Sequence, residues 1–311
     1  MPEQSVSLST PDGHQIRVHT FEPTEPDATL VIAHGMAEHS GRYTELARWL
    51  ANRDIAVFIY DHRGHGSACH GEDLGHYADD QGWQKVTSDL ARVIQWARER
   101  YPDTPLALLG HSMGSFIAQS YAQNHAHRQE AGIDRLILSA TNRIQRAQLQ
   151  ASKAFIGTIA ACYGKRHRSN AVAKMTFGKF NSLFRPNRTD YDWLSRDEQQ
   201  VDRYATDPLC GFQCTTGLWL DFIGGMLSID PRQWRKDLPV RLISGDCDPV
   251  GEMGKGIRQH YKNLQQAGIA DVTLSLFPGG RHEMLNETNA AEVWQTLYQS
   301  LPGVSAPPEN T

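Results

Sequence analysis

Gly110-His111-Ser112-Met113-Gly114 is the stretch that decides which fold this sequence predicts. It follows the apolar run 105–109 directly and precedes the helix-like stretch 115–119, so the local order is strand, sharp turn, helix. A serine at the apex of such a turn has a strained backbone and an Oγ lifted into a cleft. Glycine two positions to either side lets the strand and the helix pack closely. The stretch therefore predicts that Ser112 is a nucleophile.

A lone Gly-x-Ser-x-Gly string carries little weight in a chain with 26 glycines, so the rest of the sequence has to agree with it. Enzymes that use this turn also need an oxyanion-binding loop after an earlier strand. The β-rich run 28–33 ends at His34-Gly35-Met36, where Gly35 permits a tight turn. We expect the backbone N–H groups of Met36 and Met113 to bind the negative oxygen of a tetrahedral intermediate. His34 is expected only to bind backbone.

An acid and a histidine should follow in that order, each after a further strand. Residues 240–245 are predicted to form a buried parallel strand, which is followed by Asp246 and Asp248, and the strand predicted over 272–277 is followed by His282. We favour Asp248 as the acid because it stands three residues after Gly245 and just before a proline, while Asp246 remains the alternative. His282 is the expected base.

Four segments resemble the monoacylglycerol lipase and lysophospholipase branch of the α/β-hydrolases, a serine aminopeptidase S33-like group: 34–43, 61–66, 110–114 and 281–287. The resemblance covers about residues 5 to 300. It implies an α/β-hydrolase fold, with a mostly parallel eight-stranded sheet flanked by helices and a helical cap insertion. It further implies an esterase or lipase that cleaves a monoacylglycerol or a lysophospholipid through Ser112, Asp248 and His282, without a metal or organic cofactor.

By the same resemblance, four residues of the segment 34–43 would shape the loop beside the leaving-group alcohol of the substrate: Glu38, His39, Arg42 and Tyr43. In the segment 61–66, the spacing of His62 and His65 could suggest a metal site, but no third ligand lies nearby in sequence. We expect this segment to brace the nucleophile turn instead.

The alternation of strand and helix patterns predicts a single α/β core formed by residues 1–140 and 231–301. Helices are expected over 83–101 and 290–301, and a strand over 134–140. The alternation breaks over 141–230, which we predict to be a helical cap, or lid, over Ser112. Residues 302–311 are expected to be a flexible tail.

The first half of the predicted cap has an unusual charge. Residues 141–189 contain no aspartate or glutamate and ten basic residues: Arg143, Arg146, Lys153, Lys165, Arg166, Arg168, Lys174, Lys179, Arg185 and Arg188. Two interpretations stay open. The cap could lie on an anionic membrane surface, or its apolar stripe could pack on the core while the charges form a solvated face.

The composition agrees with an intracellular enzyme. A net charge of −4 gives no general attraction to nucleic acid, and five scattered cysteines argue against a disulfide framework. Cys210 and Cys214 could face each other across one helical turn, which would more often mean packing than metal binding. No apolar leader and no run of about 18 apolar residues is visible. We predict a cytoplasmic protein, with peripheral contact at the inner membrane face as an open alternative; the sequence does not predict its oligomeric state.

Other activities remain compatible with the same three residues, including cleavage of short-chain esters, thioesters, amides or carbon–carbon bonds. Epoxide hydrolases and haloalkane dehalogenases need an aspartate in the position of Ser112. A non-catalytic binding protein that kept the fold is a remote alternative.

Overall fold

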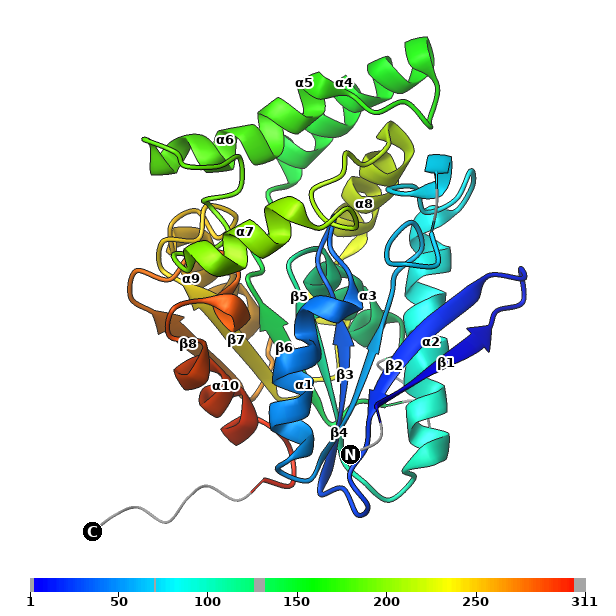
Figure 1. The fold of residues 1–311 in the computed structure, drawn as a ribbon, viewed down its shortest axis with the longest axis vertical. Coiled ribbons are helices and arrows are strands. Elements are labelled where there is room, and N and C mark those ends of the chain that lie inside the picture. The colour runs from blue at the N-terminus through cyan, green and yellow to red at the C-terminus, as the bar shows by residue number, and fades with distance from the viewer. Residues whose placement is uncertain (1–2, 70, 126–131, 305–311) are drawn as a thin grey trace.

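The computed structural model describes residues 3–69, 71–125 and 132–304, which form one sheet with helices on both faces and a helical layer above it (Figure 1). The sheet has eight strands in the order β1-β2-β4-β3-β5-β6-β7-β8. The β1–β2 and β2–β4 pairs are antiparallel and the other five pairs are parallel, so the predicted mostly parallel eight-stranded sheet is confirmed. The strands are β1 Glu3–Ser9, β2 Gln15–Phe21, β3 Ala28–Ala33, β4 Ile55–Tyr60, β5 Leu106–His111, β6 Arg135–Ser139, β7 Val240–Gly245 and β8 Val272–Phe277.

The central strands are buried on both faces because helices cover both sides of the sheet. All six residues of β3, of β4 and of β5 are buried, as near-continuous apolar strands in a parallel sheet should be. Alternate side chains of β3 enter different cores: Val31 and Ala33 pack on one face, and Leu30 and Ile32 on the other.

The helices divide between these two faces. Helices α1 Thr44–Ala51 and α10 Ala290–Gln299 cover the face of Leu30. Helices α2 Gly82–Arg100, α3 Met113–Asn124 and α9 Lys255–Gln266 cover the face of Val31. The helices predicted over 83–101 and 290–301 and the strand predicted over 134–140 are thus confirmed, with ends that differ by one or two residues.

Between β6 and β7 the chain forms the predicted helical insertion, whose outer part lies across the top of the molecule in Figure 1. Its elements are α4 Arg146–Tyr163, α5 Asn170–Ala173, a π-helical turn Lys174–Gly178, α6 Lys179–Asn181, α7 Glu198–Thr206 and α8 Thr216–Ser228. Helix α8 joins the core cluster of α2 and α3 through Leu218 and Phe222, and α4 and α5 reach the same cluster through Ile156 and Val172. The insertion is therefore rooted in the body of the molecule through these helices.

Three smaller predictions, on the tail, on membrane-spanning helices and on a cysteine pair, can be compared with the structure. Of the predicted tail, Val304 packs against the cluster of α1 and α10, while residues 305–311 lie outside the described residues. Within the described ranges, no helix combines the length and the hydropathy needed to cross a bilayer. The prediction that Cys210 and Cys214 face each other across a helical turn is wrong: α8 begins only at Thr216, and the two thiols lie in different apolar clusters.

Candidate active site

Ser112 stands at the sharp turn between β5 and α3, with φ 51° and ψ −117°. The side chain is partly exposed, between buried His111 and buried Met113. The two flanking glycines are required by close packing: a Cβ on Gly110 would collide with the carbonyl of Gly114, and a Cβ on Gly114 would collide with the end of β3. The turn holds Ser112 in a conformation that non-glycine residues rarely adopt, with its hydroxyl facing the loops that follow the other strands.

Three loops bring their side chains together at this end of the sheet. Ser112 Oγ lies 2.9 Å from His282 Nε2, and His282 Nδ1 lies 2.9 Å from Asp248 Oδ1. The loops follow β5, β7 and β8, so the carboxyl ends of parallel strands position all three groups. Asp246 has a different contact, since its Oδ1 accepts a hydrogen bond from the Gly279 amide at 2.7 Å. It is Asp248, not Asp246, that contacts the imidazole.

The surroundings of His282 favour its protonated form. Burial alone lowers the pKa of this imidazole, because His282 is only 3% exposed. The adjacent, fully buried Asp248 carboxylate acts in the opposite direction and prevails, so the pKa of His282 is raised above its ordinary value. The site can therefore hold a proton on the imidazole at modest cost.

The loop after β3 is tied down on both sides of Met36. The Gly35 amide donates to Glu38 Oε1, and the Ala37 amide donates to His65 Nε2 at 3.2 Å. Met113 opens α3, so its N–H belongs to the first turn, where helical amides have no intrahelical partner.

The buried imidazoles under this loop bind backbone. His34 Nδ1–H donates to the Gly35 carbonyl at 2.8 Å, and its Nε2 accepts from the His62 amide at 3.1 Å. His62 Nε2 lies 3.0 Å from the His34 carbonyl, and His65 Nδ1 lies 2.9 Å from the Arg63 carbonyl. Burial lowers the pKa of all three side chains, so they stay neutral. The His62 and His65 pair thus holds loops together.

A buried charge network lies behind the loop. Glu38 binds the Gly35 amide, accepts from Tyr43 Oη at 2.8 Å and pairs with Arg42 Nε at 3.2 Å. Arg42 also pairs with Glu283, the residue after His282. Glu38, Arg42 and Tyr43 are therefore interior residues that join the loop after β3 to the loop that carries His282. Sequence reasoning missed Glu283, although its place beside the expected base was a usable signal.

His39 lies apart from this network and lines a cavity of about 190 Å³. It is part of one group in the described chain whose ligand atoms lie within 4.8 Å of one another, with Asp207 and Cys210. His39 Nε2 already donates to Asp207 Oδ2 at 2.9 Å. Burial raises the pKa of Cys210 far above its ordinary value, so its thiol keeps its proton. The group therefore fits a hydrogen-bonded pair beside a buried thiol better than a metal centre.

Aromatic side chains of the insertion lie directly against the site. The Trp193 ring centroid is 4.9 Å from that of His282, and Phe177 and Phe180 pack on the other sides of Trp193. Nothing in the sequence pattern singled out Trp193, since only the folded chain brings it to His282.

Six of the ten basic residues of 141–189 have partners within the protein. Arg143, Arg166 and Arg188 pair with carboxylates, while Arg146, Lys165 and Arg168 donate to backbone carbonyls. The other four cations of this stretch are Lys153, Lys174, Lys179 and Arg185.

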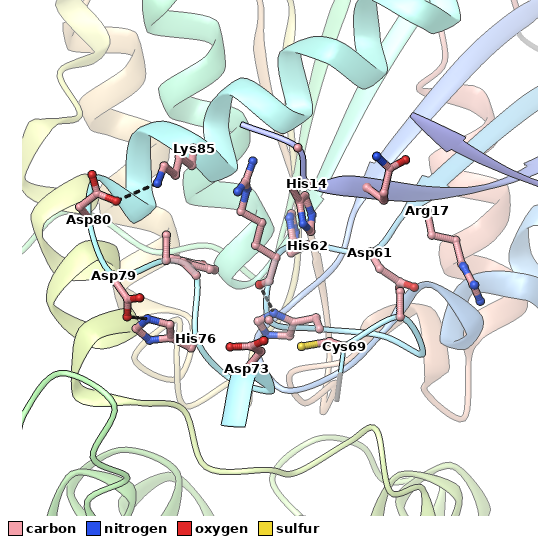
Figure 2. Close-up of a pocket in the computed structure, with 18 of the residues that line it drawn as sticks. His14, Arg17, Asp61, His62, Cys69, Asp73, His76, Asp79, Asp80 and Lys85 are labelled. Carbon is pink, nitrogen blue, oxygen red and sulfur yellow. Dashed lines mark hydrogen bonds and ion pairs between the residues drawn. The ribbon is translucent and has the colours of Figure 1, made fainter. Parts of the chain in front are cut away.

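A separate cavity of about 530 Å³ lies between the β1–β2 turn, the loop after β4 and the start of α2 (Figure 2). Its walls are charged: His14, Asp73, Asp79 and Lys85 all line it, and Figure 2 shows Asp79 bound to His76 and Asp80 bound to Lys85. Ser112 is not among its lining residues. Such walls do not suit an acyl chain, and we assign no substrate to this cavity.

Comparisons with known proteins agree with this geometry. A family model described as "Serine aminopeptidase, S33" (Hydrolase_4) matches residues 24–289. Human monoglyceride lipase is 29% identical over 339 residues, covering 99% of this chain and 100% of the human protein. The monoacylglycerol lipase of Mycolicibacterium smegmatis is 28% identical, covering 85% of this chain and 84% of that protein.

Solved structures show the same architecture. The crystal structure of a thermostable carboxyl esterase from Bacillus coagulans in complex with glycerol superposes with a TM-score of 0.85 at 26% identity, covering 96% of this chain and 97% of that one. The eight-stranded sheet with its helical insertion is the α/β-hydrolase fold. The chain therefore belongs to the serine aminopeptidase S33 (Hydrolase_4) family of the α/β-hydrolases.

Proposed function

We propose that this protein is a serine hydrolase that cleaves the carboxylic ester of a single-chain lipid, a monoacylglycerol or a lysophospholipid, through Ser112, His282 and Asp248. The observation that carries the proposal is the pair of 2.9 Å contacts that links serine, imidazole and carboxylate in series. An activated serine of this kind attacks acyl carbonyls.

The proposed reaction passes through an acyl-enzyme. His282 Nε2 takes the proton of Ser112 as its Oγ attacks the ester carbonyl, and Asp248 orients and stabilises the imidazolium. The amides of Met36 and Met113 bind the oxyanion, which is worth about 100- to 1000-fold in rate for each donor. The imidazolium then protonates the leaving alcohol, and water releases the acyl group by the same route.

The insertion supports a lipid acyl group as the substrate moiety. We propose that residues 141–230 act as the lid of the site, with the cluster around Trp193 as apolar wall; Phe177, Phe180 and Phe184 pack against this cluster. Monoglyceride lipases among the relatives, and the glycerol complex of the esterase, favour a glycerol ester. In this scheme the loop beside the leaving alcohol is held by Glu38, Arg42 and Tyr43. His39 lies at the edge of that loop.

We also propose that the outer face of the insertion touches anionic membranes to collect such substrates. Four of the five exposed large apolar side chains in the described chain lie in this insertion: Phe155, Tyr163, Met175 and Leu183. The cations Lys153, Lys174, Lys179 and Arg185 come from the same stretch. Apolar and cationic side chains together are what an interfacial surface needs.

The first test is hydrolysis of p-nitrophenyl esters with acyl chains from two to sixteen carbons, comparing the wild type with Ser112→Ala. We expect activity that peaks at medium or long chains and is lost in the variant. Monoacylglycerol and lysophosphatidylcholine of the same acyl chain then compare the two head groups. Activity confined to acetyl and butyryl esters would contradict a lipid substrate and favour a small-molecule carboxylesterase.

A second candidate function is amide hydrolysis, because the matching family model is described as a serine aminopeptidase. Amino acid p-nitroanilides test it with the same Ser112→Ala control. Turnover of anilides that exceeds turnover of every ester would replace the ester proposal.

A further inference from the structure

We propose that Trp193 is a positioning residue for His282, whose indole π-face stabilises the imidazolium that forms during acyl transfer. The inference deepens the proposed function and rests on it for the part that His282 plays. It concerns a residue of the insertion that no sequence motif marks.

The geometry places the indole against the ring of the base. The ring centroids are 4.9 Å apart and the planes are inclined by 35°. Both ring nitrogens of His282 are engaged in its plane, with Ser112 and Asp248. The indole therefore approaches the imidazole away from its two nitrogens, and the small angle between the planes turns the ring faces toward each other. A cation within about 6 Å of an indole centroid is attracted by the ring quadrupole, more strongly when water is excluded.

Water is excluded here, because Trp193 is 5% exposed and His282 is 3% exposed. Phe177 stacks on Trp193 at 5.8 Å and 16°, and Phe180 lies 5.3 Å away. The Trp193 amide donates to Asn181 Oδ1 at 3.2 Å. Trp193 is thus held by two aromatic rings and by a hydrogen bond to its backbone.

The backbone around Trp193 is clamped to the backbone around His282. The Glu283 amide donates to the Leu194 carbonyl at 2.7 Å. Arg281 donates to the carbonyls of Asp192 and Ser195, the latter at 3.1 Å. The residues on both sides of Trp193 are therefore bound to the residues on both sides of His282. This arrangement fixes the distance between the two rings.

Other charged groups also act on the imidazole and set the background for any measurement. Asp248 from the loop after β7, Glu283 on the loop of His282 itself and Glu38 from the loop after β3 favour the imidazolium. His111 of β5 lies 5.1 Å away on ring centroids, and burial lowers its pKa to about 4, so it stays neutral at working pH. Arg42 is already paired with Glu38 and Glu283. Within the described residues, no ring contact or side-chain hydrogen bond joins Trp193 to any of these groups.

The test compares Trp193→Leu, which keeps apolar cover but removes the π-face, with Trp193→Phe, which keeps a smaller π-face. In Trp193→Leu we expect kcat/KM at the plateau to fall by about 2- to 30-fold. The acid limb of its pH profile should move to lower pH by about 0.3 to 1.5 pH units. Trp193→Phe should lie between Leu and the wild type. Trp219→Leu removes an indole that packs on Phe177 and Phe222 and should leave the position of the limb unchanged.

A second readout is independent of ester hydrolysis. The pKa of His282 can be followed by NMR in histidine-labelled protein, with its signal assigned by His282→Gln. A lower pKa in Trp193→Leu supports the inference even if no ester is cleaved, in which case only the proposed function fails. Ester hydrolysis with the same His282 pKa in wild type, Trp193→Phe and Trp193→Leu would overturn the inference and leave the function standing. If Trp193→Leu does not fold, Trp193→Phe alone decides by the same criterion.

Discussion

Ser112 combines two features that a purely structural serine does not need. Its φ of 51° lies in a region that costs a non-glycine residue roughly 1 to 3 kcal/mol. Its hydroxyl is also directed at a buried imidazole whose opposite nitrogen contacts a buried carboxylate. Strain of this kind persists where the surroundings enforce it, and here glycines on both sides and the end of β3 do so.

The direction of the His282 pKa predicts the pH dependence of hydrolysis. The base must be neutral to accept the serine proton, so kcat/KM rises with pH through the pKa of His282. Because Asp248 raises that pKa despite burial, we expect the midpoint of the acid limb above pH 6.5. A pH–rate profile on a soluble ester measures it, and a rate that is flat from pH 5 to 8 would exclude His282 as the base.

The choice of acid gives a second prediction at this scale. Asp248→Asn keeps the shape of the side chain but removes the charge that orients and stabilises the imidazolium, so kcat should fall by roughly 10⁴-fold. Asp246→Asn is the matched control, because Asp246 holds the Gly279 amide and not the imidazole. A larger loss in Asp246→Asn than in Asp248→Asn would reverse the assignment.

The residues that meet at the site could be predicted because chain order and strand ends constrain them. Ser112 and His282 each follow a recognisable strand, and parallel strands deliver their carboxyl ends to one edge. Asp246 and Asp248 could not be separated physically from sequence, because both lie in the same short loop and only side-chain direction distinguishes them. Trp193 could not be predicted, since its approach to His282 depends on how the insertion folds back.

At the scale of elements, the network of Glu38, Arg42 and Glu283 joins two loops that lie far apart in the sequence. Buried ion pairs contribute little net stability when complete, but the loss of one partner leaves an uncompensated charge. The network therefore acts less as a source of stability than as a constraint on the relative position of the loop after β3 and the loop of His282.

Removing Glu38 should leave buried donors without an acceptor. We expect Glu38→Ala to lower the free energy of unfolding by roughly 2 to 6 kcal/mol, because the buried Gly35 amide and the Tyr43 hydroxyl each lose their acceptor, at about 1 to 3 kcal/mol for each group. Glu45→Ala is the control: Glu45 pairs with Arg203 on the surface, where such pairs contribute about 0 to 1 kcal/mol. Urea unfolding of both variants measures the difference. Equal losses would show that the Glu38 network is no more than a surface-like contact.

Helices and strands of the core were predictable because their apolar periodicity is regular, whereas the insertion was predictable only as helical. Its short helices α5 and α6 flank a π-helical turn, and no sequence period marks such a turn. The segment of Cys210 and Cys214 illustrates the same limit: four-residue spacing matched a helix, but hydrogen bonds from Gly211 to Ala37 and from Thr215 to Gly75 hold it as an irregular strap across the loops below.

At the scale of the whole molecule, the insertion is bound to the body at two places and also carries exposed apolar side chains. Arg166 pairs with Asp73 and Asp79 in the loop before α2, and the segment around Trp193 is clamped to the loop of His282. Several of the basic residues that suggested a continuous basic surface in the sequence thus form ion pairs or hydrogen bonds within the protein. The proposed membrane contact would therefore depend on the other four cations of residues 141–189 and on the exposed apolar side chains of the insertion.

The separation of cations that bind within the protein from the other four predicts which charges govern lipid binding. The combined change of Lys153, Lys174, Lys179 and Arg185 to Gln should weaken binding to phosphatidylserine-containing vesicles, by up to about fivefold for each residue. Changing Lys255, Arg258 and Lys262 of α9 to Gln is the control, because it removes exposed charge of the same sign outside residues 141–230. Flotation of vesicles with bound protein measures both, and 0.5 M NaCl should abolish most of the difference, since salt screens exposed charges. Two outcomes would contradict the prediction: equal recovery on pure phosphatidylcholine and on anionic vesicles, or an equal loss of binding in the α9 variant and in the insertion variant. Either outcome would show that the outer face of the insertion is a solvated surface with no electrostatic part in substrate capture.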